Sequence, residues 1–228
     1  KAILFLGAGA ARGAAASTVP KEPPSSKELG RLLSDKFLGG DSADKPLALI
    51  GEYCIAESDL RTVQRYIGDI FNRYSPCAAQ RAIADFRWAA LVTTNYDQII
   101  EKAYAENKDR LQTPVAILRN TDRIDHELRA PDAVPLLKLH GCVSMVDEIA
   151  YPLILTIDQY VSHRVGREKL FNRFTEYAGE YSVIYVGYQI EDSDIRSILL
   201  QLNTPEISRP MQYVVTPNPS PKIGRAHV

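Results

Sequence analysis

The sequence has few cysteines and no long apolar run. Its 3 cysteines, Cys54, Cys77 and Cys142, lie far apart and form no CxxC pair. This spacing argues against a disulfide framework and against a structural zinc site. No segment approaches the roughly 20 apolar residues that cross a bilayer, and no basic-then-apolar signal segment opens the chain. We therefore expect a protein of the reducing cytoplasm with no membrane partner.

The chain also lacks an excess of charge of either sign. It has 27 Lys and Arg against 28 Asp and Glu, a formal net charge of -1. This balance gives no electrostatic sign of a nucleic-acid partner. Hydrophobic residues make up 45% and charged residues 24% of the sequence, which excludes a disordered chain or a fibre. A length of 228 residues fits one large domain or one domain with an insert.

Short apolar runs alternate with helical patterns along the chain. We expect strands at residues 2–6, 89–93, 114–120, 135–139, 182–186 and 211–216. We expect helices at residues 27–37, 76–88, 98–105, 157–177 and 192–202, and a mostly helical segment at 47–74. This alternation predicts an α/β fold, a Rossmann-like parallel sheet flanked by helices. No clear strand lies between residues 27 and 88, which predicts a helical insert after the first strand.

Both ends of the sequence have an artificial character. The chain begins at Lys1 inside a strand pattern, and its last six residues can be encoded by a string that resembles a sequencing-adapter read. We expect residues 1–220 to form the domain and residues 221–228 to be a non-native tail. We also expect a further C-terminal region to be missing.

Four predicted strands end in glycine-rich or polar residues. These ends are Gly7-Ala8-Gly9-Ala10, Thr93-Thr94-Asn95-Tyr96-Asp97, Lys138-Leu139-His140-Gly141 and Gly187-Tyr188-Gln189. Ligands of open parallel sheets bind outside the carboxyl ends of the strands, so we expect one site there. The glycine loop could bring backbone N–H groups close to a phosphate or pyrophosphate, or form a plain tight turn. The spacing of Gly7, Gly9 and Gly13 departs from GxGxxG, which disfavours a standard dehydrogenase.

Each polar residue at these ends also has a structural interpretation. Asn95 and Asp97 are typical of a helix N-cap with an acidic first turn. His140 fits a core histidine bonded to the backbone, and it also fits a general acid or base near neutral pH. Lys138 fits a surface position at the strand edge, with a contact to a ligand as the alternative.

The order of these motifs resembles that of a known family. FLGAGA at residues 5–10 is followed by TTNYD at 93–97, KLHG at 138–141 and VGYQIEDSDIRSILL at 186–200. Over about residues 1–218 the chain resembles the sirtuin-like NAD-binding domain, in the branch found in bacterial defence proteins. TTNYD with KLHG downstream is the more specific part of this resemblance.

The resemblance implies NAD as the substrate and no metal. It implies that one set of residues binds the phosphates and the rest of the cofactor, namely Gly7, Ala8, Gly9, Ala10, Thr94, Gly187 and Tyr188. It implies that a second set faces or acts on the nicotinamide ribose, namely Asn95, Asp97 and His140. Asn218 falls near the position where the family contacts the adenosine side.

The chain departs from the protein-deacylating sirtuins in three ways. Those proteins carry a four-cysteine zinc module between the histidine and the late strands, where this chain has only Cys142. Thr94 stands where the deacylase motif has Gln. The Gly-x-Pro that follows the glycine loop in the family reads Thr18-Val19-Pro20 here, without a following Asp-Phe-Arg. These departures favour plain NAD cleavage over a peptide substrate.

We therefore expect an NAD+ hydrolase that cleaves the nicotinamide–ribose bond to give nicotinamide and ADP-ribose. The resemblance places this activity in bacterial antiviral defence by abortive infection. It also implies a homo-oligomer, or a fused or associated sensor module. Two alternatives remain open: a catalytically silent module that senses NAD or ADP-ribose, and an NAD-dependent protein deacylase.

Overall fold

The computed structural model describes residues 1–18, 20–122, 124–162, 165–188, 193–201 and 210–215. Asn218 and the predicted tail at residues 221–228 lie outside this part of the chain. Six parallel strands form one sheet in the order β3-β4-β2-β1-β5-β6. They are β1 (Ile3–Leu6), β2 (Ala90–Thr93), β3 (Thr113–Ile117), β4 (Ala133–Lys138), β5 (Val183–Val186) and β6 (Gln212–Val215). The predicted Rossmann-like α/β fold is confirmed.

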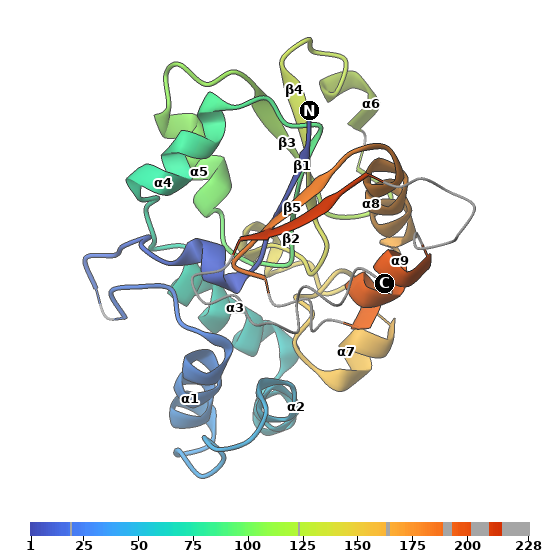
Figure 1. Cartoon of the computed structure of the whole chain (residues 1–228). Coiled ribbons are helices and arrows are strands. Elements are labelled where there is room, and N and C mark those ends of the chain that lie inside the picture. Colours follow the sequence, from blue (N-terminus) through green and yellow to red (C-terminus); the bar gives the residue numbers. More distant parts are fainter. Residues whose placement is uncertain (19, 123, 163–164, 189–192, 202–209, 216–228) are drawn as a thin grey trace.

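Helices cover both faces of the sheet and one of its ends. They are α1 (Ser26–Phe37), α2 (Leu47–Glu57), α3 (Leu60–Phe71), α4 (Ala78–Arg81), α5 (Ile99–Glu106), α6 (Ile124–Glu127), α7 (Ile157–Ser162), α8 (Glu168–Glu180) and α9 (Ser193–Gln201). Figure 1 shows α4 and α5 on one side of the sheet and α8 and α9 on the other. It places α1, α2, α3 and α7 beyond the carboxyl ends of the strands. Within the described helices, none is long and apolar enough to cross a membrane.

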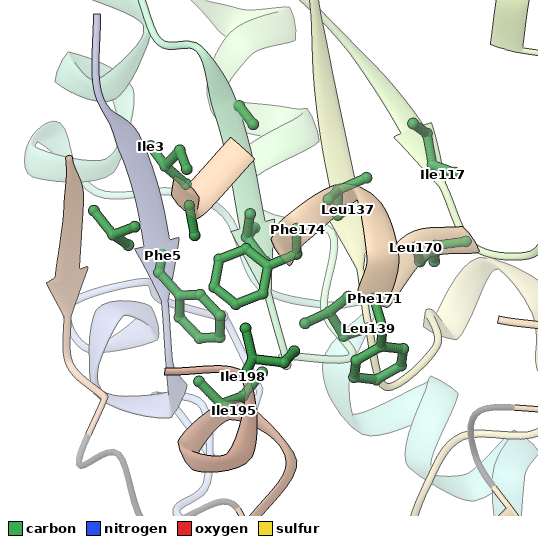
Figure 2. Packing of buried hydrophobic residues seen from close by; sticks show 14 of the residues in the cluster. Ile3, Phe5, Ile117, Leu137, Leu139, Leu170, Phe171, Phe174, Ile195 and Ile198 are labelled. Atoms are coloured by element: carbon green, nitrogen blue, oxygen red, sulfur yellow. The ribbon is translucent and has the colours of Figure 1, made fainter. Parts of the chain in front are cut away.

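The alternation of side chains along β1 divides the sheet into two cores. Ile3 and Phe5 point to the face that α8 and α9 cover, and Leu4 and Leu6 point to the face that α5 covers. Figure 2 shows the first of these cores, with Phe174 of α8 against the strands. The central strands β1 and β2 are buried along their whole length, so they read as continuous apolar runs.

The insert helices have a core of their own. Its buried members include Leu29 and Leu33 of α1, Ile50 and Cys54 of α2, and Val63, Ile67 and Ile70 of α3. Ile99, Leu153 and Leu155 belong to the same cluster, although they come from segments that follow β2 and β4. The insert is therefore anchored to the loops at the carboxyl end of the sheet, where the site was predicted.

Two predicted helices differ from the observed ones. The helix predicted at residues 76–88 consists of α4 and a short 3-10 turn. The regular pattern ends there because the carbonyl of Ile83 accepts a hydrogen bond from the indole N–H of Trp88 at 2.9 Å. The helix predicted at residues 157–177 is divided into α7 and α8. Gly166 lies between them with a φ of +76°, which no right-handed helix contains.

The loops that follow β1 and β5 touch through their backbones. Gly7 N donates to Val186 O at 3.0 Å, and Gly9 N donates to Gly187 O at 2.9 Å. Gly187 has a φ of +61°, and a Cβ atom on it would lie 2.1 Å from Ala10 N. Glycine is therefore required at this position for both its conformation and its size. The chain leaves β1 and β5 in opposite directions across the sheet, which makes this the topological switch point.

Gly187→Ala tests this contact, with Gly39→Ala as the matched control. Gly39 has a similar φ of +64°, but a Cβ atom on it would have no neighbour within 4 Å. Both variants carry a left-handed backbone penalty of roughly 1 kcal/mol. Only Gly187→Ala adds a steric clash, which we expect to lower the free energy of unfolding by a further ~2 kcal/mol. Urea denaturation measures both, and equal losses would contradict the contact.

Candidate functional site

Three of the predicted site loops meet at the carboxyl edge of the sheet. Thr93 at the end of β2 pairs with Leu6 of β1 on one side and with Lys138 of β4 on the other. Asn95 and His140 each lie two residues beyond these paired positions. Neighbouring strands are about 4.8 Å apart, so the structure brings the Asn95 loop, the His140 loop and the glycine loop together as predicted.

Hydrogen bonds fix the orientation of Asn95. The hydroxyl of Thr93 donates to Leu6 O at 2.8 Å and accepts from Asn95 N at 2.9 Å. The Asn95 side chain then donates through Nδ2 to Gly7 O at 3.0 Å. Among the described residues, none donates a hydrogen bond to Asn95 Oδ1. Asn95 and its neighbour Thr94 are half-buried, so this oxygen can accept a hydrogen bond from a ligand or water.

The glycine loop presents two different sides. A Cβ atom on Gly7 would lie 2.6 Å from Gly187 O, and one on Gly9 would lie 2.8 Å from Gly187 Cα. Both glycines therefore make room for the loop after β5. On the other side, Ala8 and Gly9 are exposed and carry no side chain larger than a methyl group. A ligand can therefore approach the loop closely, although the N–H groups of Gly9 and Ala10 are bonded to Gly187 O and Gly7 O.

Tyr188 packs beneath the glycine loop. Its ring centroid lies 4.7 Å from that of Phe5 and 6.2 Å from that of Tyr185. A Cβ atom on Gly7 would lie 2.7 Å from the Tyr188 ring. Tyr188 therefore supports the loop from the core, and residues 189–192 of the same motif lie outside the described part of the chain.

Asp97 is turned inward and is only 5% exposed. Its Oδ1 accepts a hydrogen bond from Ile99 N at 3.0 Å, at the start of α5. Burial raises the pKa of the Asp97 carboxyl above its ordinary value, although the nearby Lys138 ammonium acts in the opposite direction. The predicted N-cap is not observed, because the N-cap of α5 is Gln98 and the Asn95 side chain bonds Gly7 O instead. The bond of Asp97 to Ile99 N holds the turn between Asn95 and α5.

Lys138 is 1% exposed, so the prediction of a surface position is wrong. Its Nζ donates to Asp97 O and to Glu101 Oε1, the latter at 2.8 Å. Burial alone would lower the pKa of Lys138, but its acidic neighbours, Glu101 foremost, together outweigh burial and the pKa is raised. The ammonium therefore stays charged and ties the Asn95 turn to α5. No sequence signal paired Lys138 with Glu101, because their partnership depends on the contact between β4 and α5.

His140 is nearly enclosed, with 4% of its surface exposed. Its ring meets the ring of Tyr160 edge-on, with centroids 5.5 Å apart and an interplanar angle of 87°. Gly141 follows with a φ of +92°, which turns the chain away from the sheet edge. The imidazole therefore lies behind Tyr160 of α7, shielded from bulk water.

A segment that the sequence did not single out connects the polar loops. Residues 152–156 form this segment, named the strap below. Ile154 N donates to His140 O at 3.1 Å, and the Tyr96 hydroxyl donates to Ile154 O. Tyr96 also accepts at its backbone oxygen from Val143 N at 2.9 Å. The strap therefore joins the Asn95 loop to the His140 loop.

Within the described residues, no group of three or more His, Cys, Asp or Glu could hold a metal ion.

Comparisons with known proteins agree with this geometry. No curated protein matches the sequence. The model of the SIR2-like domain family matches residues 89–227, which is more than half of the chain and includes the Asn95, His140 and Gly187 loops. Proteins of this family are typically NAD-dependent enzymes, so the match indicates NAD binding or use. The chain belongs to the family of SIR2-like domains.

Proposed function

We propose that the protein is an NAD+ hydrolase that cleaves the nicotinamide–ribose bond to give nicotinamide and ADP-ribose. The observation that carries this proposal is the hydrogen bond from Asn95 Nδ2 to Gly7 O at 3.0 Å. It fixes one polar side chain at the topological switch point, between the glycine loop and His140. Ligands of open α/β sheets bind at such points.

The residues present fit a dinucleotide. The exposed loop at Ala8 and Gly9 leaves room for the pyrophosphate, with Ala8 N as its backbone donor, because Gly9 N is bonded to Gly187 O and holds the loop against β5. Thr94 and Asn95 lie at the next strand end, where the nicotinamide ribose would follow. Binding energy at the pyrophosphate would then hold the reacting ribose in a fixed geometry.

Hydrolysis breaks the bond between the ribose C1′ and the nicotinamide nitrogen. Nicotinamide leaves with the bonding electrons, water adds to C1′, and the water gives up a proton. The transition state resembles an oxocarbenium ion, as in sugar transfer. Asn95 Oδ1 would orient the water or a ribose hydroxyl. His140 would take the proton, directly or through the ribose hydroxyls.

Asp97 has an indirect role in this proposal. Its carboxylate accepts a hydrogen bond from Ile99 N at the start of α5 and so sets the turn that presents Asn95. Such a role needs an acceptor oxygen at this position and no negative charge.

The resemblance to the defence branch of the family supports a place in bacterial antiviral defence. In that setting, NAD loss halts the infected cell. It also supports a homo-oligomer, or a fused or associated sensor module, as the partner that switches the activity on.

Nicotinamide release from NAD by the purified chain tests the proposal, beside Asn95→Ala and His140→Ala. We expect each variant to lose activity roughly hundredfold or more, because each removes a group that acts on the ribose or the proton. Two matched controls should keep wild-type rates. Asn107→Ala removes an asparagine bonded to the Arg81 carbonyl, and His126→Ala removes an exposed histidine.

The products and the binding data separate the alternatives. Binding of NAD by calorimetry without nicotinamide release would support the silent sensor instead. Nicotinamide release that requires an acylated peptide would support the deacylase. Full activity in both site variants would overturn the assigned roles.

Asp97→Asn and Asp97→Ala test the indirect role of this residue. Because the pKa of Asp97 is raised, the native state binds its proton more tightly than the unfolded state, and ionisation at neutral pH reduces stability. We expect Asp97→Asn to be at least as stable as wild type at pH 7. This advantage should shrink as the pH falls toward the ordinary carboxyl pKa, because wild type regains stability there.

Asp97→Ala should lose about 1 kcal/mol of stability at every pH, since it removes the acceptor of the hydrogen bond from Ile99 N. Urea unfolding at pH 7 and at a mildly acidic pH measures both effects. Asp97→Asn should also keep most nicotinamide release. A complete loss of release in this variant would show instead that the carboxylate itself acts on the ribose.

A further inference from the structure

Two buried side chains hold the strap from different parts of the molecule. Gln64 of α3 is 1% exposed, and its Oε1 accepts a hydrogen bond from Leu153 N at 2.7 Å. Arg167, directly before α8, is 3% exposed, and its Nη2 donates to Pro152 O at 2.7 Å. Gln64 belongs to the insert, and Arg167 precedes a helix that packs on the sheet. Their side chains bond the adjacent residues Leu153 and Pro152 of the strap.

Both polar side chains are costly to bury at these positions. Gln64 Nε2 and Arg167 Nε are buried, and neither atom has a hydrogen-bond partner among the residues that the structure describes. Across the part of the chain that the structure describes, no carboxylate forms an ion pair with Arg167. Burial lowers the pKa of its guanidinium, as expected for a cation without a counter-charge. The one hydrogen bond that each side chain makes to the strap therefore offsets only part of the cost of burying it.

The strap transmits these contacts to His140. Pro152 O, which Arg167 binds, would lie 3.3 Å from a Cβ atom on Gly141, so the turn after His140 rests against this oxygen. One residue beyond Leu153, Ile154 N donates to His140 O. Leu153, Ile154 and Leu155 are all buried, so the strap is packed as well as bonded.

We propose that Gln64 and Arg167 are positioning residues, which hold His140 through the strap in the geometry that proton transfer needs. This inference rests on the proposed hydrolase function. Neither residue contacts the exposed glycine loop, so their loss should lower kcat and leave KM nearly unchanged.

Gln64→Met and Gln112→Met form a matched pair that tests the role of Gln64. Gln112 is also a buried glutamine bonded to backbone, through Trp88 N at 2.6 Å and Trp88 O at 3.1 Å. It lies before β3, at the amino end of the sheet, away from the site. Both variants should lower the melting temperature. Only Gln64→Met should lower kcat for nicotinamide release, by roughly tenfold to hundredfold.

Arg167→Met and Arg167→Lys form the second pair. Methionine removes the donor to Pro152 O, and we expect the same loss of kcat as in Gln64→Met. Lysine keeps one donor and the charge, so it should restore most of kcat. A fall in kcat as large in Gln112→Met as in Gln64→Met, or no fall in either strap variant, would overturn the proposal.

A readout without substrate separates this proposal from the proposed function. Amide hydrogen exchange by NMR follows the N–H of Ile154, the donor to His140 O. We expect exchange at least roughly tenfold faster in Gln64→Met and Arg167→Met, with displaced His140 imidazole signals, and neither change in Gln112→Met. If wild type released no nicotinamide, the hydrolase function would fail, and this exchange would still decide the role of the strap. Unchanged exchange and imidazole signals in both strap variants would overturn it.

Discussion

The contact between the backbones of Gly187 and of the Gly9–Ala10 turn is the constraint on which the site depends. With 2.1 Å between a hypothetical Gly187 Cβ and Ala10 N, no side chain fits between the loops after β1 and β5. This contact sets the position of the glycine loop, and Gly7 O in turn receives the Asn95 amide. The orientation of Asn95 thus follows from a packing requirement two strands away, since β5 and β2 lie on opposite sides of β1.

The parts of this structure that local pattern determines could be predicted from the sequence. β1 is buried on both faces and β5 is buried on one face and half-buried on the other, so their continuous apolar runs identified them within a residue or two. The loops at the strand ends could also be placed together, because parallel strands bring their carboxyl ends to one edge of the sheet.

Features that depend on distant partners could not be predicted. Gln64 and Leu153 are 89 residues apart in sequence, and nothing in either neighbourhood indicates the other. The burial of Lys138 likewise depends on Glu101, which lies in α5, the helix that follows the neighbouring strand β2. Asp97 shows a third case. Its residue type fits both a contact with the ribose and a hydrogen bond at the start of a helix, and only the structure shows that its side chain points inward.

The segment after His140 is fixed here by hydrogen bonds and apolar packing. The deacylating sirtuins, from which the chain departs at this point, carry a zinc module between the corresponding histidine and the late strands. In this chain Gln64, Arg167 and Tyr96 bind successive backbone groups of the strap, while Leu153 and Leu155 enter the core of the insert. The insert between β1 and β2 is therefore part of the support of the site as well as a cover over it.

The strand order has a consequence for synthesis of the protein in the cell. β1 is complete at residue 6, but its neighbour β5 begins only at residue 183. Translation at roughly 5–20 residues per second separates the two by about 10–40 s. During that interval the glycine loop has no Gly187 to rest on, and β1 can pair only with β2. A growing chain on the ribosome therefore cannot complete the site at the glycine loop until β5 has been made, so an unfinished copy lacks the contact that positions Gly7 O for Asn95.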